Sequence, residues 1–409
     1  MNILGFLIGL SVITGFLAEE TRVELVQIIF RHGARTPVLT YPKDPYQESH
    51  WNKYGGFGQL TPTGMAQHYE YGKFLRNRYA GFLNKTYNRN GAHIISTDYD
   101  RTLMSAYSLL ASLYEPEGEQ VWNKNLAWQP VPVHIGDPKI FLNQETCARY
   151  SELTVQTKQS EEYIEISKQY KEIIEIADMN SGFTNIDLFQ LWKIADAVII
   201  EKSFNLTLPD WVEKNYNEIR SSQDHGFYFD YYYPEMAKLA AGGILNEVRN
   251  NFLNKTKGNS RELYLFSSHD TYVASMTKLL NLTSRINQPP FASSVVLELR
   301  KSVTSSKYYV QVYLKNNTDS EPIDFKEVTV YGCEKLCPLD DFMRITDSMI
   351  VTDYAKECTR KGVQVSQILN PTFILAVGFA FVVSLVVSVF SIISCRRSYR
   401  RSGYREGEL

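Results

Sequence analysis

Three short polar clusters in this 409-residue sequence each follow a run of apolar residues that predicts a buried strand. Residues 31–37, Arg-His-Gly-Ala-Arg-Thr-Pro, follow the run at 23–30. Residues 100–102, Asp-Arg-Thr, come shortly after the run at 93–96, and His269-Asp270 follows the run at 263–266. Strands of an open α/β sheet place such segments around one crevice beyond their carboxyl ends, so we expect the three clusters to form one site.

The cationic members of these clusters suit a phosphate monoester. An arginine is always charged, and its planar fork matches the oxygens of a phosphoryl group. We therefore expect Arg31, Arg35 and Arg101, helped by His269, to bind those oxygens and to stabilise the charge of the transition state. With so many cationic groups, no metal ion or other cofactor is expected.

The two remaining residues have the chemistry of a nucleophile and a proton donor. A neutral His32 can attack phosphorus in line and form a phosphohistidine, and Gly33 beside it lets the backbone come close. Asp270, protonated, can give its proton to the leaving alkoxide and then act as the base for the attacking water. The expected reaction is hydrolysis of a phosphate monoester in two steps.

The elements that must position these residues read as an α/β fold. Thr61 followed by Pro62 predicts a helix start, and apolar spacing extends the helix to about residue 79 with His68 at its surface. Further helices are expected at 100–114 and 271–280, and strands at 295–299 and 308–313. We predict a mixed, mostly parallel sheet flanked by helices, with a helical subdomain inserted at about 147–252 and periodic over 161–177 and 235–252.

Two hydrophobic segments predict the topology of the chain. Residues 1–18 read as a signal peptide, with a buried N-terminal helix as the alternative. Residues 372–394 have the length of a transmembrane helix. Four arginines follow at once, at positions 396, 397, 400 and 401, and mark the tail at 395–409 as cytoplasmic. The prediction is a single-pass type I membrane protein with a stalk at 359–371. A GPI signal, the alternative, would end in its hydrophobic tail.

Potential glycosylation sites and cysteines lie between these two segments, as a lumenal or extracellular location requires. There are five sequons, at Asn84, Asn205, Asn254, Asn281 and Asn316. Four cysteines, an even number, lie on the same side: Cys147, Cys333, Cys337 and Cys358. Three pairings are possible; the short Cys333/Cys337 spacing favours a local pair, which leaves Cys147 with Cys358. A zinc site at Cys333 and Cys337 has no second pair of ligands nearby.

The charge balance excludes one class of partner. Lys and Arg number 43 against 45 for Asp and Glu, so the chain lacks the basic excess that a nucleic-acid backbone attracts. The many aromatic residues, with 27 Tyr and 21 Phe, argue against disorder.

The cluster at 31–37 resembles the signature of the histidine acid phosphatases. Segments 58–64, 96–106, 268–270, 289–293 and 332–334 also look like landmarks of that family, in order, so that the resemblance covers about residues 23–358. It is nearest to the prostatic and lysosomal group. The resemblance implies the roles given above for the six residues, one domain at 22–358 and the disulfides Cys147–Cys358 and Cys333–Cys337. It also implies a possible homodimer, and a small-molecule or protein phosphate monoester as substrate at the cell surface, lysosome or endosome.

Two other functions share part of this pattern. A phosphoglycerate-mutase-like transferase also uses Arg-His-Gly, but it is cytosolic and uses a glutamate as its acid. A catalytically inactive receptor could keep the fold, although the complete set of six residues argues against it. Hydrolysis of a generic aryl phosphate separates these readings.

Overall fold

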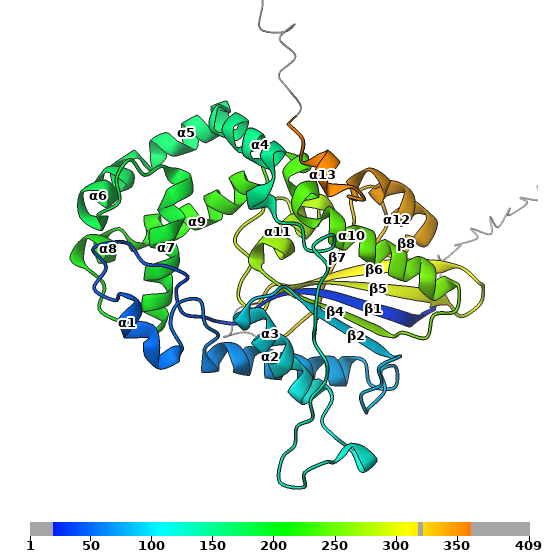
Figure 1. The fold of residues 1–409 in the computed structure, drawn as a ribbon. Helices are drawn as coiled ribbons and strands as arrows, with labels where there is room; N and C mark the ends of the chain where they lie inside the picture. The colour runs from blue at the N-terminus through cyan, green and yellow to red at the C-terminus, as the bar shows by residue number, and fades with distance from the viewer. Residues whose placement is uncertain (1–18, 318–321, 361–409) are drawn as a thin grey trace, which may run out of the picture. The chain divides into compact units, whose positions relative to one another are not determined.

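The computed structural model describes residues 19–317 and 322–360, and its centre is one eight-stranded mixed sheet (Figure 1). Seven strands follow the order β3-β2-β4-β1-β5-β6-β7, and β8 pairs with β6. The strands are β1 Thr21–Arg31, β2 Ala92–Ser96, β3 His134–Ile135, β4 Leu263–Ser268, β5 Ser294–Ser302, β6 Tyr308–Lys315, β7 Lys326–Val328 and β8 Cys337–Pro338.

The prediction of a mostly parallel sheet is wrong. Strands β3, β2, β4 and β1 run parallel, but β5 pairs antiparallel with β1, and β6, β7 and β8 continue antiparallel. The short connection between β5 and β6 fixes part of this pattern, because a tight hairpin can join only antiparallel strands. The parallel half nevertheless contains the three strands on which the candidate site depends.

Helices cover both faces of the sheet (Figure 1). Side chains alternate along β1: Val26, Ile28 and Phe30 pack with the helices α2 Pro62–Arg78 and α3 Asp100–Leu113, whereas Leu25 and Ile29 pack on the opposite face. That opposite face is covered by α10 Pro234–Thr256, α11 Asp270–Leu279 and α12 Leu339–Thr346. The sheet is therefore the middle layer of three.

The helix starts follow the predicted signals. The Thr61 side chain accepts a hydrogen bond from the Gly64 amide, with Pro62 at the first position of α2. Predicted helices at 100–114 and 271–280 correspond to α3 and α11. His68 is a correction: it is fully buried, and its Nε2 lies 3.1 Å from the carbonyl oxygen of Arg31. The imidazole of His68 on the inner face of α2 thus contacts the backbone at the end of β1.

The middle of the chain is helical, as predicted, and most of it forms a lobe beside the sheet (Figure 1). Its helices are α4 Ala148–Lys158, α5 Glu161–Gln169, α6 Lys171–Ser181, α7 Leu188–Ser203, α8 Asp210–Lys214 and α9 Tyr216–Asp230. The helical periodicity predicted over 161–177 is divided between α5 and α6 at Tyr170, whose buried ring joins the core of the lobe. A short helix, α1 Glu48–Trp51, precedes α2.

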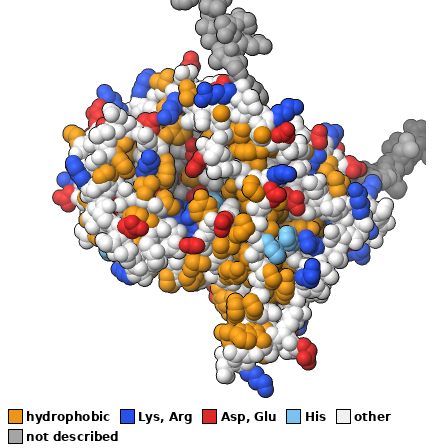
Figure 2. Space-filling view, in the orientation of Figure 1, with side chains coloured by type: hydrophobic (Ala, Val, Ile, Leu, Met, Phe, Trp, Pro, Cys, Tyr) orange, Lys and Arg blue, Asp and Glu red, His pale blue; other side chains and the backbone are white. Residues whose placement is uncertain are grey.

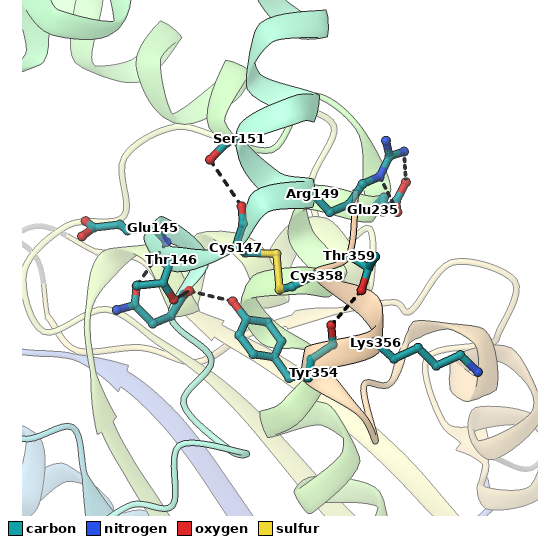
Figure 3. The surroundings of a disulfide bond; sticks show 12 residues. Glu145, Thr146, Cys147, Arg149, Ser151, Glu235, Tyr354, Lys356, Cys358 and Thr359 are labelled. Atoms are coloured by element: carbon teal, nitrogen blue, oxygen red, sulfur yellow. Dashed lines mark hydrogen bonds and ion pairs between the residues drawn. A yellow bond between two sulfur atoms is a disulfide. The ribbon is translucent and has the colours of Figure 1, made fainter. Parts of the chain in front are cut away.

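Two disulfides are present with the expected pairing. Cys147, at the start of α4, is joined to Cys358, at the end of the short helix α13 Tyr354–Glu357, across 211 residues of sequence (Figure 3). Beside this bridge Arg149 donates two hydrogen bonds to the Glu235 carboxylate, at 3.0 and 2.8 Å. The second bridge joins Cys333 and Cys337. Cys147–Cys358 therefore fixes the last described helix to the lobe.

Among residues 19–317 and 322–360, no helix is long and apolar enough to cross a membrane. The predicted signal peptide at 1–18, transmembrane helix at 372–394 and tail at 395–409 lie outside the described residues.

Candidate active site

The six predicted residues lie together at the carboxyl ends of three neighbouring parallel strands. In the register of the sheet, Arg31 of β1 pairs with Ser268 of β4, and Ser96 of β2 pairs with Ser267. The chain leaves β1 still bonded to β4, since the His32 amide donates to the Ser268 carbonyl at 3.0 Å. Arg31 to Arg35, Arg101 and His269–Asp270 therefore all follow strand ends at one edge.

Two glycines allow the loop after β1 to pack tightly on the start of α2. A Cβ atom at Gly33 would lie 2.3 Å from the Gly64 carbonyl oxygen, and one at Gly64 would lie 2.2 Å from that of Ala34. The Gly33 amide also donates to Ser105 Oγ of α3 at 3.1 Å. These contacts hold the residue next to His32 against both helices.

His32 has the protonation state that a nucleophile requires. Burial, followed by the charges of Arg31 and Arg35, lowers its pKa well below 6.5, so the ring is neutral at acidic pH. Its Nδ1 lies 2.9 Å from the Gly33 carbonyl oxygen, which can only accept, so the ring proton is on Nδ1. Nε2 therefore keeps its lone pair.

The buried Arg31 forms an ion pair with the partly buried Asp270, with 2.8 Å between Nη2 and Oδ2. Arg31 also donates to the Pro289 carbonyl, and its guanidinium carbon lies 4.1 Å from the centre of the Phe291 ring. Burial would raise the pKa of the Asp270 carboxyl, but Arg31 and Arg35 outweigh burial and the pKa lies below 3.8. Asp270 is thus ionised when it is paired with Arg31.

Arg101 and His269 form the third part of the site. Arg101 Nη2 lies 3.4 Å from His269 Nδ1, and His269 Nε2 lies 3.0 Å from Thr97 Oγ1. An arginine can only donate, so Nδ1 accepts and Nε2 carries the proton. Burial and the charge of Arg101 lower the pKa of His269 to about 3. In this arrangement His269 orients Arg101, and its expected contact with a phosphoryl oxygen remains a prediction.

The site has hydrogen-bond donors left over for an anion. The Nε atoms of Arg31, Arg35 and Arg101 are buried and have no hydrogen-bond acceptor among the described residues. Buried donors are normally paired, so three unpaired guanidinium nitrogens in one site point to an anionic ligand. Figure 2 shows this region as a hollow between the helical lobe and the sheet, with acidic and basic side chains around it.

Comparison with known proteins agrees with this geometry. A family model described as histidine phosphatase superfamily (branch 2) matches residues 22–315. The chain belongs to this superfamily. Prostatic acid phosphatase of Bos taurus is 38% identical over 354 residues, 84% of this chain and 89% of its own length. Lysosomal acid phosphatase of Homo sapiens is 35% identical over 365 residues, 87% of this chain and 85% of its own.

Solved structures of two phytases share the fold. The phytase of Citrobacter braakii superimposes with a TM-score of 0.63 at 18% identity, over 83% of this chain and 99% of that one. The apo phytase of Hafnia alvei gives 0.61 at 17% identity, over 83% and 98%. At such low identity the likeness concerns the arrangement of the elements only.

Two acidic residues of this histidine phosphatase site were missed in the sequence. Asp196, in α7, pairs with Arg35. Its signal was a charged residue inside the apolar run 194–200, because a charge in a buried helix needs a partner. Asp230 ends α9, and burial together with the charge of Asp270 raises its pKa to about 7. No local pattern in the sequence marks it.

Proposed function

We propose that this histidine phosphatase is an acid phosphatase that hydrolyses phosphate monoesters through a phosphohistidine on His32. The observation that carries the proposal is the neutral His32, with its Nε2 lone pair free, in one buried cluster with Arg31, Arg35 and Arg101. All three arginines stay protonated at acidic pH, because the pKa values of Arg31 and Arg101 fall only to about 10 and that of Arg35 rises. The curated relatives carry the same activity in their names.

The charges of the site support a role for Asp270 as the proton donor. Arg31 is balanced by Asp270 and Arg35 by Asp196. At acidic pH, where Asp230 is protonated, Arg101 is then the excess positive charge among the described residues of the site. A phosphate ester dianion brings two negative charges, so the site is neutral only if one proton enters with it. An ester that binds as its monoanion brings that proton. The Asp270 carboxylate beside Arg31 can take the proton from the bound ester and so become the acid.

The two chemical steps then balance. The His32 Nε2 lone pair forms a bond to phosphorus as the ester P–O bond breaks, and protonated Asp270 gives its proton to the departing alkoxide. In the second step Asp270 takes a proton from water as the water oxygen attacks the phosphohistidine. Inorganic phosphate leaves and His32 is neutral again. The arginines stabilise the oxygens of both transition states.

The test is hydrolysis of p-nitrophenyl phosphate at acidic pH by the full chain in detergent with EDTA, beside His32→Ala. The control is His134→Ala, since His134 is an exposed residue of β3. We expect activity in the wild type and the control and a loss of at least a thousandfold in His32→Ala. Activity that needs a metal ion, or that survives in His32→Ala, would contradict the mechanism.

We also propose the membrane topology predicted from the sequence: cleavage after the signal peptide at 1–18, a lumenal or extracellular domain at 22–358, the stalk, the span at 372–394 and a cytoplasmic tail. Exposure of all five sequon asparagines, Asn84, Asn205, Asn254, Asn281 and Asn316, supports glycosylation. Digestion with an N-glycosidase should lower the apparent mass of the cellular protein. Protease added outside intact cells or vesicles decides the orientation and separates the cell surface from the lysosome or endosome.

We propose in addition that the chain forms a homodimer through the loop between α3 and β3. This loop projects from the body at the bottom of Figure 1, and Figure 2 shows apolar side chains gathered on it. Val121, Trp122 and Leu126 there are 41%, 59% and 41% exposed. Light scattering should give a dimer that Trp122→Ser converts to a monomer with unchanged activity; a monomeric wild type would reject the proposal.

A further inference from the structure

We infer that Asp196 is a positioning residue, which holds Arg35 so that one chosen edge of its guanidinium group meets the phosphoryl group. Because Asp196 lies in α7, the helical insertion would take a direct part in phosphate binding. This inference rests on the proposed phosphatase function, and it assigns to a residue outside the three strand ends a role in the same reaction.

The hydrogen bonds of Arg35 account for three of its five N–H donors. Nη1 donates to Asp196 Oδ2 at 3.0 Å and to the Thr36 carbonyl at 3.1 Å, and Nη2 donates to Asp196 Oδ1 at 2.9 Å. A guanidinium group has five N–H bonds: one on Nε and two on each terminal nitrogen. The N–H bonds left over are that of Nε and the second one of Nη2.

These two N–H bonds lie side by side. In a guanidinium group Nη1 is on the side of Cδ, so Nε–H and the outer N–H of Nη2 point the same way. They form the edge that binds two oxygens of a phosphate at once. Nε is buried and has no acceptor among the described residues. Asp196 therefore occupies the end of the fork and leaves its side free for the phosphoryl oxygens.

Burial restricts the Arg35–Asp196 pair to this orientation. The side chains of Arg35 and Asp196 are only 6% and 5% exposed. Asp196 is further held by α7, and its Oδ2 lies 3.5 Å from the Val38 amide in the loop that carries Arg35. A buried arginine without its carboxylate would turn to other acceptors, and a shift of about 1 Å in a binding group can cost on the order of a hundredfold in rate.

The pair also adjusts the charge of the site. The Arg35 guanidinium stays beside a carboxylate and so contributes direction rather than a full excess charge. Substrate binding then depends on the orientation of the Nε/Nη2 edge. Removal of the Asp196 carboxylate makes the site more positive but leaves the guanidinium group of Arg35 free to turn. A loss of phosphate affinity in spite of the added positive charge is therefore the specific sign of positioning.

The test is Asp196→Asn in the full chain, with Glu298→Gln as the matched control. Glu298 is a buried carboxylate of β5 that pairs with Arg300 of the same strand and with Arg78 at the end of α2, away from the site. We expect Asp196→Asn to weaken competitive inhibition by inorganic phosphate about tenfold or more and to lower kcat/KM for p-nitrophenyl phosphate about 10- to 100-fold. Glu298→Gln should change neither constant by more than about twofold, although it lowers the melting temperature.

A second background separates positioning from a general loss of structure. In Arg35→Ala, the further change Asp196→Asn should have no additional effect on kcat/KM, because Asp196 acts only through Arg35. Additive losses, or unchanged phosphate inhibition in folded Asp196→Asn, would overturn the inference. Phosphate binding is also measured as the rise in melting temperature with inorganic phosphate, which needs no turnover. An inactive wild type that still shows this rise, lost in Asp196→Asn, would reject the proposed function but keep the inference.

Discussion

Asp270 Oδ2 lies 2.8 Å from Arg31 Nη2, so the residue expected to donate a proton is held in its ionised form by a residue expected to bind phosphate. Asp270 can act as the proton donor and Arg31 as the phosphate ligand only if the bound ester changes the protonation of Asp270. When phosphoryl oxygens engage Arg31, they weaken its hold on Asp270 and raise the pKa of that carboxyl. The acid is thus generated by the substrate, and this relationship leads to the first prediction.

The pH profile should follow the ionisation of the ester. A phosphate monoester loses its second proton near pH 6, and the proposed reaction needs that proton. We expect kcat/KM to fall about tenfold per pH unit above that value. Because the pKa of Asp270 is lowered in the free enzyme, the acidic side should stay level down to about pH 4. Initial rates from pH 3.5 to 8 test this, and a loss between pH 5 and pH 4 would contradict it.

Asp270→Asn should reveal the proton donor through the leaving group. p-Nitrophenolate is a stable anion that departs without a proton, whereas the alkoxide of glycerol 2-phosphate needs one. We expect the variant to lose at least about tenfold more kcat/KM with glycerol 2-phosphate than with p-nitrophenyl phosphate. Equal losses on both substrates would show that Asp270 serves binding rather than proton transfer. The matched control is Asp224→Asn. The Asp224 carboxyl accepts a hydrogen bond from the backbone amide of Gln288, whose side chain lies 3.5 Å from Asp270 Oδ2.

Gly33→Ala should strongly lower the activity, because the added methyl group displaces the backbone next to His32. The added methyl group would lie 2.3 Å from the Gly64 carbonyl oxygen, so either the loop of His32 or the start of α2 must move. We expect a loss of about a hundredfold or more in kcat together with destabilisation of a few kcal/mol. Gly226→Ala is the control: it lies in α9 with open space around its Cβ position and should be neutral or slightly stabilising. Activity measurements and thermal melting distinguish the two, and a fully active Gly33→Ala would refute the packing argument.

The sequence predicts the site better than it predicts the sheet. Strand ends and the clusters that follow them are local in the chain, so the six site residues and the helix start at Thr61 could be identified from types and spacing. The direction of β5 depends on how a long connection crosses the sheet, which no local pattern records. Asp196 and Asp230 reach the site from helices far along the chain. His68 was expected at the surface because the close packing of α2 on the loop after β1, which Gly33 and Gly64 allow, cannot be seen in the local sequence. Tertiary packing decided each of these.

The two disulfides should differ in their contribution to stability. Cys147–Cys358 closes a loop of 211 residues, and Cys333–Cys337 closes one of only 4. Loop-closure entropy then gives roughly 5 kcal/mol for the long bridge and roughly 2 kcal/mol for the short one. Urea unfolding of Cys147→Ser/Cys358→Ser and of Cys333→Ser/Cys337→Ser measures both. A larger loss in the short-loop variant would show that local strain or packing outweighs chain entropy.

Glu201 of α7 should make the domain less stable at alkaline pH. Its carboxyl is fully buried, its oxygens accept no hydrogen bond from amide or hydroxyl donors of the described residues, and it lies against Asp44. Burial, then the hydrogen bond and charge of Asp44, raise its pKa well above the ordinary carboxyl range, so the pair shares one proton in the folded state. Above about pH 5 both carboxyls are ionised in the unfolded chain, so unfolding releases that proton and stability falls as pH rises.

The informative window for Glu201 lies between pH 7 and 9. Below it, histidines with lowered pKa values, such as His68 and His269, work in the opposite direction, because they take up protons only on unfolding. Glu201→Gln should flatten the decline in the free energy of unfolding across this window, measured by urea titration at each pH. Glu213→Gln, an exposed residue of α8 paired with Lys202, should keep the wild-type slope. A slope that is unchanged in Glu201→Gln would mean that another group with a raised pKa, such as Asp230, causes the decline in stability.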